Sequence, residues 1–413
     1  MAGIAAILAP STGRGAGPAP AAELSRERRV PFWENPPPMT TCPHRPSCPG
    51  CPRFGEPGIA PAARATLDAL AAEHGLPPVP VVDGPLAGFR HRARLAIRHL
   101  EGEPFVGLFE QGSHTLVQVP HCSVHHPLIN DVAAVVRAAL VDAHTSGFDE
   151  ARHIGCARYL QVVVERESQS AQVVLVANDD NPAPLARAVV LIRERLGERL
   201  HSLWFNANMG RSNVILGPEF VRLHGPEAVV ERFGGPAIHY PPGAFGQGNL
   251  AVAELIIGRL RELVPEGARV VEYHAGVGAI GLSLLDRAAS VWLNERGAES
   301  LRGLAMGIAG LPPADQARVT TSAGGAGVAS ENAPPADVTI VDPPRKGLEP
   351  ALLARLAAQP PARLLYVSCD LGSLRRDTAQ LCAGGGLRLA GLGAWNLMPY
   401  TEHVETVAWF EHT

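Results

Sequence analysis

From about residue 241 to the C-terminus, short apolar runs alternate with stretches whose apolar residues recur at helical spacing. The apolar runs predict strands at 269–273, 290–294, 337–341, 363–367 and 405–410. The helical spacing predicts helices at 250–263 and 279–286. Strands that alternate with helices are typical of an α/β fold, in which a parallel sheet carries helices on both faces.

The preceding region has a mixed pattern. It predicts helices at 61–74 and 129–145, and strands at 92–97, 160–164, 171–177 and 201–206. Polar residues alternate with Val, Leu and Ile in most of these strands, so we expect half-buried antiparallel strands. We assign residues 56–240 to a central α+β domain and residues 241–413 to the α/β domain. No internal repeat is visible.

The N-terminal residues show neither periodicity. Residues 1–38 are rich in Ala, Gly and Pro and are expected to be disordered, whereas residues 39–55 form a Pro- and Cys-rich segment. The short apolar stretch at the start has no basic flank, so we expect no secretory signal, and no apolar run is long enough to span a bilayer.

Composition narrows the function classes only slightly. The 413 residues are 46% hydrophobic and 18% charged, as in a soluble protein of two or three domains. With a net charge of −4, nucleic-acid binding would need a local basic surface. The candidate is the segment 89–94 with Arg98 and His99, although an ordinary solvated strand face would look the same. The seven cysteines, an odd number without a signal peptide, favour metal binding or catalysis over disulfides.

A glycine-rich loop lies between the strand 269–273 and the next predicted helix. Gly276 and Gly278 let a ligand approach the backbone N–H groups closely. Glu295 ends the following strand, where a carboxylate can accept hydrogen bonds from ribose hydroxyls. The loop matches the first motif of S-adenosylmethionine (SAM) methyltransferases, but a dinucleotide-binding loop or a plain strand–helix turn would look similar.

The strand 337–341 runs directly into the sequence Asp-Pro-Pro-Arg. The two prolines stiffen the turn and hold the Asp342 carboxylate at the strand end, where ligands of open α/β sheets bind. Amino-group methyltransferases carry an aromatic residue where this chain has Arg345, which argues against N-methylation of adenine or cytosine. Asp342 would accept the N3–H of uracil, an edge that is an acceptor in cytosine. A purely structural turn is the alternative.

A cysteine, Cys369, follows the apolar strand 363–367. C5 of uridine is a poor nucleophile, but a thiolate that adds to C6 converts the ring into an enolate that is nucleophilic at C5. A general base must then remove the C5 proton, and Glu405 near the C-terminus is the candidate. A lone cysteine at the end of a buried strand is more often a core residue, so only the ordered set of motifs favours catalysis.

Five motifs occur in one order: F-G-Q-G-N at 245–249, E-Y-H-A-G-V-G at 272–278, D-P-P-R at 342–345, L-Y-V-S-C at 365–369 and H-V-E at 403–405. In this the chain resembles the RNA 5-methyluridine (uracil-C5) methyltransferase family, particularly its iron–sulfur 23S rRNA-type members, from about Cys42 to Phe410. The resemblance implies a class I SAM-methyltransferase domain, preceded by a central RNA-binding domain and a small iron–sulfur segment.

The resemblance also implies residue roles. Cys369 would be the nucleophile and Glu405 the general base, acting on a uridine flipped out of its stack. The residues that would hold SAM or the uracil are Phe245, Gln247, His274, Gly276, Gly278, Glu295 and Asp342. A [4Fe–4S] cluster of structural role would be bound by Cys42, Cys48, Cys51 and Cys122, a spacing that also permits zinc. We expect a cytoplasmic monomer without membrane contact, acting on rRNA in preference to tRNA.

Several positions depart from the family pattern. Glu272 replaces an aspartate, His274 an aromatic residue, Ala279-Ile280 an Asn-Phe pair and Asp370-Leu371 an Asn-Pro pair, while residues 322–325 lack the expected polar residue. The chemical residues are thus retained while the SAM pocket is altered. Two alternatives remain open: an RNA-binding paralogue with impaired SAM use, and an iron–sulfur redox protein.

Overall fold

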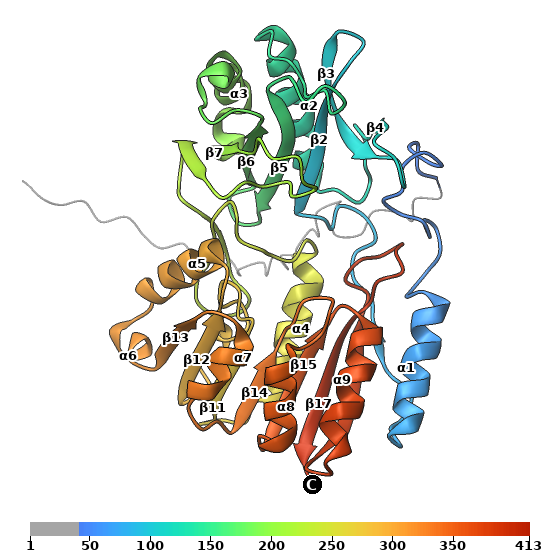
Figure 1. The fold of residues 1–413 in the computed structure, drawn as a ribbon, viewed down its shortest axis with the longest axis vertical. Coiled ribbons are helices and arrows are strands. Elements are labelled where there is room, and N and C mark those ends of the chain that lie inside the picture. Colours follow the sequence, from blue (N-terminus) through green and yellow to red (C-terminus); the bar gives the residue numbers. More distant parts are fainter. Residues whose placement is uncertain (1–40) are drawn as a thin grey trace, which may run out of the picture.

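The computed structural model describes residues 41–413 (Figure 1). These residues form two large sheets and one two-stranded sheet. The predicted disorder of residues 1–38 lies outside the described residues. In Figure 1 the C-terminal sheet, coloured yellow to red, lies below a smaller domain in cyan and green. The Cys-rich segment, in blue, lies at one side between the two. No helix in the described range is long and apolar enough to cross a membrane.

The C-terminal sheet has eight strands in the order β1-β16-β17-β15-β14-β11-β12-β13, and all are parallel except β17. Strand order reverses between β11 and β14, and ligands bind at such a switch point, outside the carboxyl ends of the strands. The strands are β1 (Val81–Val82), β11 (Arg269–Tyr273), β12 (Ser290–Glu295), β13 (Val319–Ala323), β14 (Val338–Val341), β15 (Arg363–Ser368), β16 (Leu387–Trp395) and β17 (Glu405–His412).

Helices cover both faces of this sheet, which confirms the predicted α/β architecture. Apolar residues of α4 and α5 join the core on one face, and residues of α1, α7, α8 and α9 join the core on the other. The helices are α1 (Pro61–Glu73), α4 (Leu250–Leu263), α5 (Ala298–Ala309), α6 (Pro313–Gln316), α7 (Ala326–Ala329), α8 (Pro350–Ala358) and α9 (Leu371–Ala383).

Two sequence-based assignments are corrected here. Helix α1 and strand β1 belong with the C-terminal sheet and not with the central domain, because β1 pairs in parallel with β16 and α1 packs beside α9. The predicted helix 279–286 is instead a turn followed by a 3₁₀ turn at Leu282–Leu284. Gly281 lies so close to the Glu272 carboxyl that a Cβ would approach its oxygen to 2.4 Å, so the turn packs against the end of β11 at a position that only glycine fits.

The central domain is a seven-stranded sheet in the order β4-β3-β2-β5-β6-β7-β8, antiparallel except for the β6–β7 pair. Helices α2 and α3 cover one face. Its elements are β2 (Arg92–Leu100), β3 (Glu103–Phe109), β4 (Leu116–Gln118), α2 (Pro127–Asp142), β5 (Ala157–Glu165), β6 (Ser170–Ala177), α3 (Ala186–Leu196), β7 (Leu200–Ala207) and β8 (Phe220–His224), and the hairpin β9 (Val229–Glu231) and β10 (Ile238–Tyr240) leads on to α4.

The two middle strands of this sheet differ from the half-buried strands that we expected. Every residue of β5 and β6 is buried. On the face away from the helices, Trp204 and Tyr159 pack with Ile215 and Phe220. The sequence pattern missed this second layer because its apolar residues come from the loop that follows β7 and from β8.

Candidate active site and cysteine pocket

Three neighbouring strands on one side of the switch point, β14, β15 and β17, carry the predicted residues at one edge of the C-terminal sheet. Asp342 follows β14, Cys369 follows β15 and Glu405 begins β17. In the antiparallel β15–β17 pair Ser368 lies opposite Thr406, whose hydroxyl donates to the Ser368 carbonyl at 3.0 Å. Cys369 and Glu405 are the residues next to this pair, so the sheet itself brings the predicted nucleophile and the predicted base together.

The pKa values of the three groups are coupled. Burial raises the pKa of Glu405, which is 4% exposed, well above its usual range, and the Asp342 carboxyl adds to that increase. Burial raises the pKa of Asp342 to about 7. The pKa of the Cys369 thiol is also raised, first by burial and then by Glu405 and Asp342, while Arg345 lowers it. The thiol and the two carboxyls therefore act on one another within a single site.

The glycine loop after β11 adopts a conformation that suits glycine. Gly276 and Gly278 have φ values of 58° and 83°, and a Cβ on Gly278 would lie 2.6 Å from a methyl carbon of Leu304. The Glu295 carboxylate accepts hydrogen bonds from the backbone N–H groups of Gly276 at 2.9 Å and of Gly297 at 2.6 Å. Glu295 therefore joins the end of β12 to the loop.

Beside this loop lie polar atoms that have no partner among the described residues. Both ring nitrogens of His274, which has a φ of 61°, are buried without a hydrogen bond, as is Oε2 of Glu272. Burial lowers the pKa of His274 and raises that of Glu272 well above its usual range. Buried polar groups are normally hydrogen-bonded, so the missing partners make this place a candidate ligand site.

Glu349 is a residue of this region that the motifs did not reveal. Its carboxylate accepts the backbone N–H of Gly327 at 2.8 Å, at the start of α7. Gly325 is close enough that a Cβ there would lie 3.4 Å from the same carboxylate, which also acts electrostatically on His274. A carboxylate from the start of α8 thus lies where residues 322–325 lack a polar side chain. No short motif marks it, because it comes from a different loop.

The F-G-Q-G-N segment connects the two domains. Phe245 is 65% exposed, and Gln247 lies at a small cavity beside Arg92. Arg92 donates to the carbonyl of Ala244 at 2.8 Å. Asn249 caps α4 and donates to the carbonyl of Leu397 at 3.1 Å, in the loop that precedes Glu405. The structure therefore places Gln247 and Phe245 between the central domain and the active-site loop.

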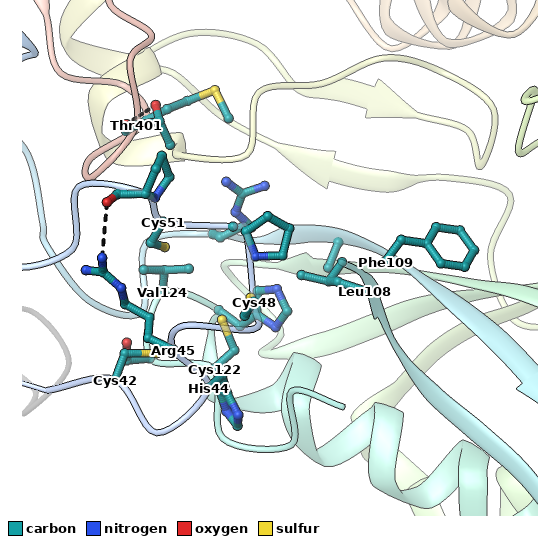
Figure 2. A pocket seen from close by; sticks show the side chains of 18 of the residues that line it. Cys42, His44, Arg45, Cys48, Cys51, Leu108, Phe109, Cys122, Val124 and Thr401 are labelled. Carbon is teal, nitrogen blue, oxygen red and sulfur yellow. Dashed lines mark hydrogen bonds between the residues drawn. The ribbon is translucent and has the colours of Figure 1, made fainter. Parts of the chain in front are cut away.

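The four N-terminal cysteines share one cavity of about 480 Å³ (Figure 2). Cys42, Cys48 and Cys51 come from the Cys-rich segment, and Cys122 comes from the loop before α2. Burial raises the pKa of Cys51 to about 12, and the nearby thiols of Cys122, Cys48 and Cys42 contribute to that rise. Between residues 41 and 413, no three His, Cys, Asp or Glu side chains stand close enough to ligate a single metal ion.

Comparison with known proteins identifies the family. An RNA methyltransferase of Protochlamydia amoebophila is 32% identical over 379 residues, which are 90% of this chain and 97% of that protein. An RNA methyltransferase of Gloeobacter violaceus is 29% identical and matches 82% of this chain and 74% of its own length. The chain belongs to the RNA methyltransferase family. This confirms the family recognised from the five motifs and the enzyme class, a SAM-dependent RNA methyltransferase. No family model matches the sequence.

A solved structure supports the fold of this RNA methyltransferase. The Pyrococcus abyssi tRNA (uracil-54, C5)-methyltransferase, in complex with S-adenosyl-L-homocysteine, superimposes with a TM-score of 0.68. The match covers 84% of this chain and 81% of that chain at 23% identity. The two proteins therefore share the α/β methyltransferase fold.

The basic segment that we considered for RNA binding in this methyltransferase is largely structural. Arg98 is 4% exposed, pairs with Glu150 at 2.8 Å and lies 4.8 Å from the ring centre of Phe109. Burial lowers the pKa of Arg92 to about 10. Arg90 and Arg94 line the cysteine cavity. Cys156 and Cys382 pack partly buried against two of the hydrophobic cores.

Proposed function

We propose that this RNA methyltransferase transfers a methyl group to C5 of a uridine through a covalent bond between Cys369 and C6. The observation that carries the proposal is the meeting of Cys369, Glu405 and Asp342 at adjoining strand ends. A thiol beside a buried base is the pair that addition and elimination at a pyrimidine ring require.

The proposed reaction begins with the uracil in the site and its N3–H donating to Asp342. The Cys369 thiol gives its proton to solvent water, and the thiolate forms a bond to C6 while the electrons of the C5–C6 double bond shift to give an enolate with its charge on O4. C5 then attacks the methyl carbon that SAM supplies, and S-adenosylhomocysteine leaves. Glu405 takes the C5 proton, the electrons of that C–H bond restore the C5–C6 double bond, and the bond to Cys369 breaks.

The raised pKa values of Glu405 and Cys369 predict how the rate of the proposed reaction depends on pH. A carboxylate with a raised pKa is a stronger base once it is ionised, although a smaller fraction is ionised at neutral pH. Thiolate formation is likewise favoured by alkaline pH, because the pKa of Cys369 is raised. The rate of methyl transfer should therefore increase with pH above neutrality.

The donor site in this proposal is the glycine loop. Gly276 and Gly278 would admit SAM to the backbone, and the unpaired atoms of His274 would contact it. Glu295 would bind the ribose hydroxyls after releasing one of its backbone N–H partners. Gln247 and Phe245 would lie on the RNA side, because they are in the segment between the central domain and the active-site loop.

For the cysteine cavity we propose a [4Fe–4S] cluster held by Cys42, Cys48, Cys51 and Cys122. A cubane cluster separates its four ligating sulfurs widely, whereas zinc draws all four to about 2.3 Å from one point. The observation that supports a site held by all four cysteines is the cavity that they share. The cluster would tie the Cys-rich segment to the central domain and take no part in the methyl transfer.

The substrate in this proposal is rRNA, with tRNA as the competing candidate. The preference for 23S rRNA rests on the resemblance to cluster-bearing rRNA enzymes, whereas the structural relative from Pyrococcus abyssi is named for a tRNA uracil. Nucleoside mass spectrometry distinguishes them, after anaerobically purified protein and SAM are incubated with unmethylated rRNA or tRNA. We expect 5-methyluridine in the rRNA. A methylated base other than 5-methyluridine would contradict the proposal.

A further inference from the structure

The loop that precedes Glu405 is held by the Cys-rich segment. Residues 396–404 connect β16 to β17, and Glu405 is the first residue of β17. The backbone N–H of Arg53 donates to the carbonyl of Tyr400 at 3.0 Å, and its guanidinium donates to the carbonyl of Thr401 at 3.4 Å. The rings of Phe54 and Tyr400 lie 4.8 Å apart at 38°. In Figure 2 Thr401 approaches the cavity from the side of Cys51.

The residues Arg53 and Tyr400, which make these contacts, are buried. Arg53 is 7% exposed, and its Nε donates to Glu56 at 2.9 Å. Tyr400 is 5% exposed and packs with Phe89 and Val124, against which Cys51 and Phe54 also pack. Tyr400 has a φ of 66°, a conformation that a residue with a side chain keeps only when its surroundings impose it. Arg53 and Phe54 provide part of those surroundings.

Cys369, by contrast, lies at the junction of β15 and α9, outside this loop. The Asp370 carboxylate caps α9 by accepting the backbone N–H of Ser373 at 2.7 Å. The Ser368 hydroxyl donates to the carbonyl of Asp370 at 2.9 Å. Cys369 is therefore held between β15 and α9. Glu405, in contrast, directly follows the loop that Arg53 and Phe54 contact.

We propose that Arg53 and Phe54 are positioning residues that set the place of the Glu405 carboxyl, so that the Cys-rich segment controls the removal of the C5 proton. The inference rests on the proposed function. The proposal predicts an effect on one step only, because the addition of Cys369 to C6 and the methyl transfer precede the removal of the C5 proton by Glu405. Loosening the loop should slow only proton removal and the release of Cys369 that follows it.

The test compares two RNA substrates with the full-length wild type and the Phe54→Ala variant. With 5-fluorouridine RNA the reaction stops after methyl transfer, since no proton is present at C5, and the rate of adduct formation should match the wild type within about twofold. With uridine RNA, kcat should fall about 10- to 100-fold, as expected for a misplaced catalytic group. KM for the RNA should be nearly unchanged. The hydrogen isotope effect with 5-deuterouridine RNA should increase.

Three further variants make the test specific. Phe54→Tyr keeps the ring and should restore turnover. Arg53→Ala removes the contact to Thr401 and should show the same selective loss as Phe54→Ala. Phe105→Ala, which truncates a phenylalanine of β3 that is half-buried like Phe54, should show no selective loss. If Phe54→Ala does not fold, Phe54→Leu keeps apolar volume without the ring contact.

The outcomes separate the two proposals. If the wild type forms no adduct with 5-fluorouridine RNA, the proposed function fails. If the wild type forms it, but Phe54→Ala loses adduct formation and turnover equally, the segment stabilises the fold and does not position Glu405. Unchanged turnover and isotope effect in a folded Phe54→Ala variant would also overturn the inference.

Discussion

Two groups of cysteines in this protein have different neighbours, although an arginine lowers the pKa of a thiol in each group. Cys369 lies beside the carboxyls of Glu405 and Asp342 at the open end of a parallel sheet. Cys51 lies among three other thiols in a cavity also lined by Arg90. Cys369 thus has carboxyls beside it that can accept a proton, whereas Cys51 has several sulfurs and the Arg90 guanidinium beside it. In our proposal, the neighbours of each thiol, and not its burial alone, distinguish the nucleophile Cys369 from the cluster ligands.

The largest expected effect tests the first half of that comparison. Cys369→Ala should lower methyl transfer at least about 10⁴-fold, because no other group can add to C6. Its iron content should equal that of the wild type, since Cys369 lies outside the cysteine cavity. Nucleoside mass spectrometry and iron analysis on the same preparation check both expectations. Residual transfer within tenfold of the wild type would exclude Cys369 as the nucleophile.

Glu405→Gln should have the next largest effect. Turnover should fall about 10²- to 10⁴-fold, and the covalent enzyme–RNA complex should accumulate with ordinary uridine RNA, because the C5 proton stays in place. Denaturing gel electrophoresis detects the complex. Normal turnover without accumulation would show that another group is the base.

Changing the second group of cysteines should affect a different property. Cys48→Ala should remove most of the iron and lower the melting temperature, because one of four sulfurs is lost. Cys156→Ala is the matched control, since Cys156 lies outside the cavity, and it should retain the iron. Iron analysis and thermal melting provide the readout. Equal iron contents in the two variants would show that Cys48 is not a cluster ligand.

A smaller effect concerns pH and stability. The folded-state pKa of Asp342 is raised to about 7, above its ordinary value near 3.8, so this carboxyl keeps its proton in the folded protein where the unfolded chain has lost it. The stabilisation is complete below pH 4 and is lost as the pH rises through 7. Relative to the wild type, Asp342→Asn should gain melting temperature between pH 4 and 8, by about 2–4 °C. A constant difference across that range would contradict the assignment.

The smallest effect is expected at Arg345, which is exposed and hydrogen-bonds to His403 at 3.2 Å. Arg345 lowers the pKa of Cys369, so Arg345→Ala should raise it and move the pH–rate profile toward higher pH. At neutral pH the rate should fall only about two- to fivefold, because an exposed charge is screened by solvent. Arg345→Lys should keep the profile of the wild type. A shift toward lower pH would contradict the electrostatic account.

Local elements were largely predictable from sequence. The bounds of α4 and β11 agree with the predicted ranges 250–263 and 269–273, since an amphipathic period and an apolar run are strong local signals. The helix predicted at 279–286 is wrong: the segment forms a turn and a 3₁₀ turn, and Gly281 packs on Glu272. A sequence pattern contains no information about such a contact.

The residues of the site also divide into those that local sequence signals predict and those that depend on tertiary contacts. The motifs identified Cys369, Asp342 and Glu405 because each follows or begins a strong strand signal. The burial of Arg98 and the approach of Glu349 to α7 were not predictable, since both depend on side chains from distant loops. The contact between Arg53 and Thr401 joins residues 348 positions apart, and no local pattern marks it.

The central claim is that Cys369 bonds to C6 of a uridine while the cavity cysteines do not. Its most direct test is mass spectrometry of the peptides crosslinked to 5-fluorouridine RNA in the presence of SAM. We predict one crosslinked peptide, with the pyrimidine on Cys369 and a methyl group on its C5. A pyrimidine attached to Cys42, Cys48, Cys51 or Cys122, or methylated RNA without any adduct, would contradict the account.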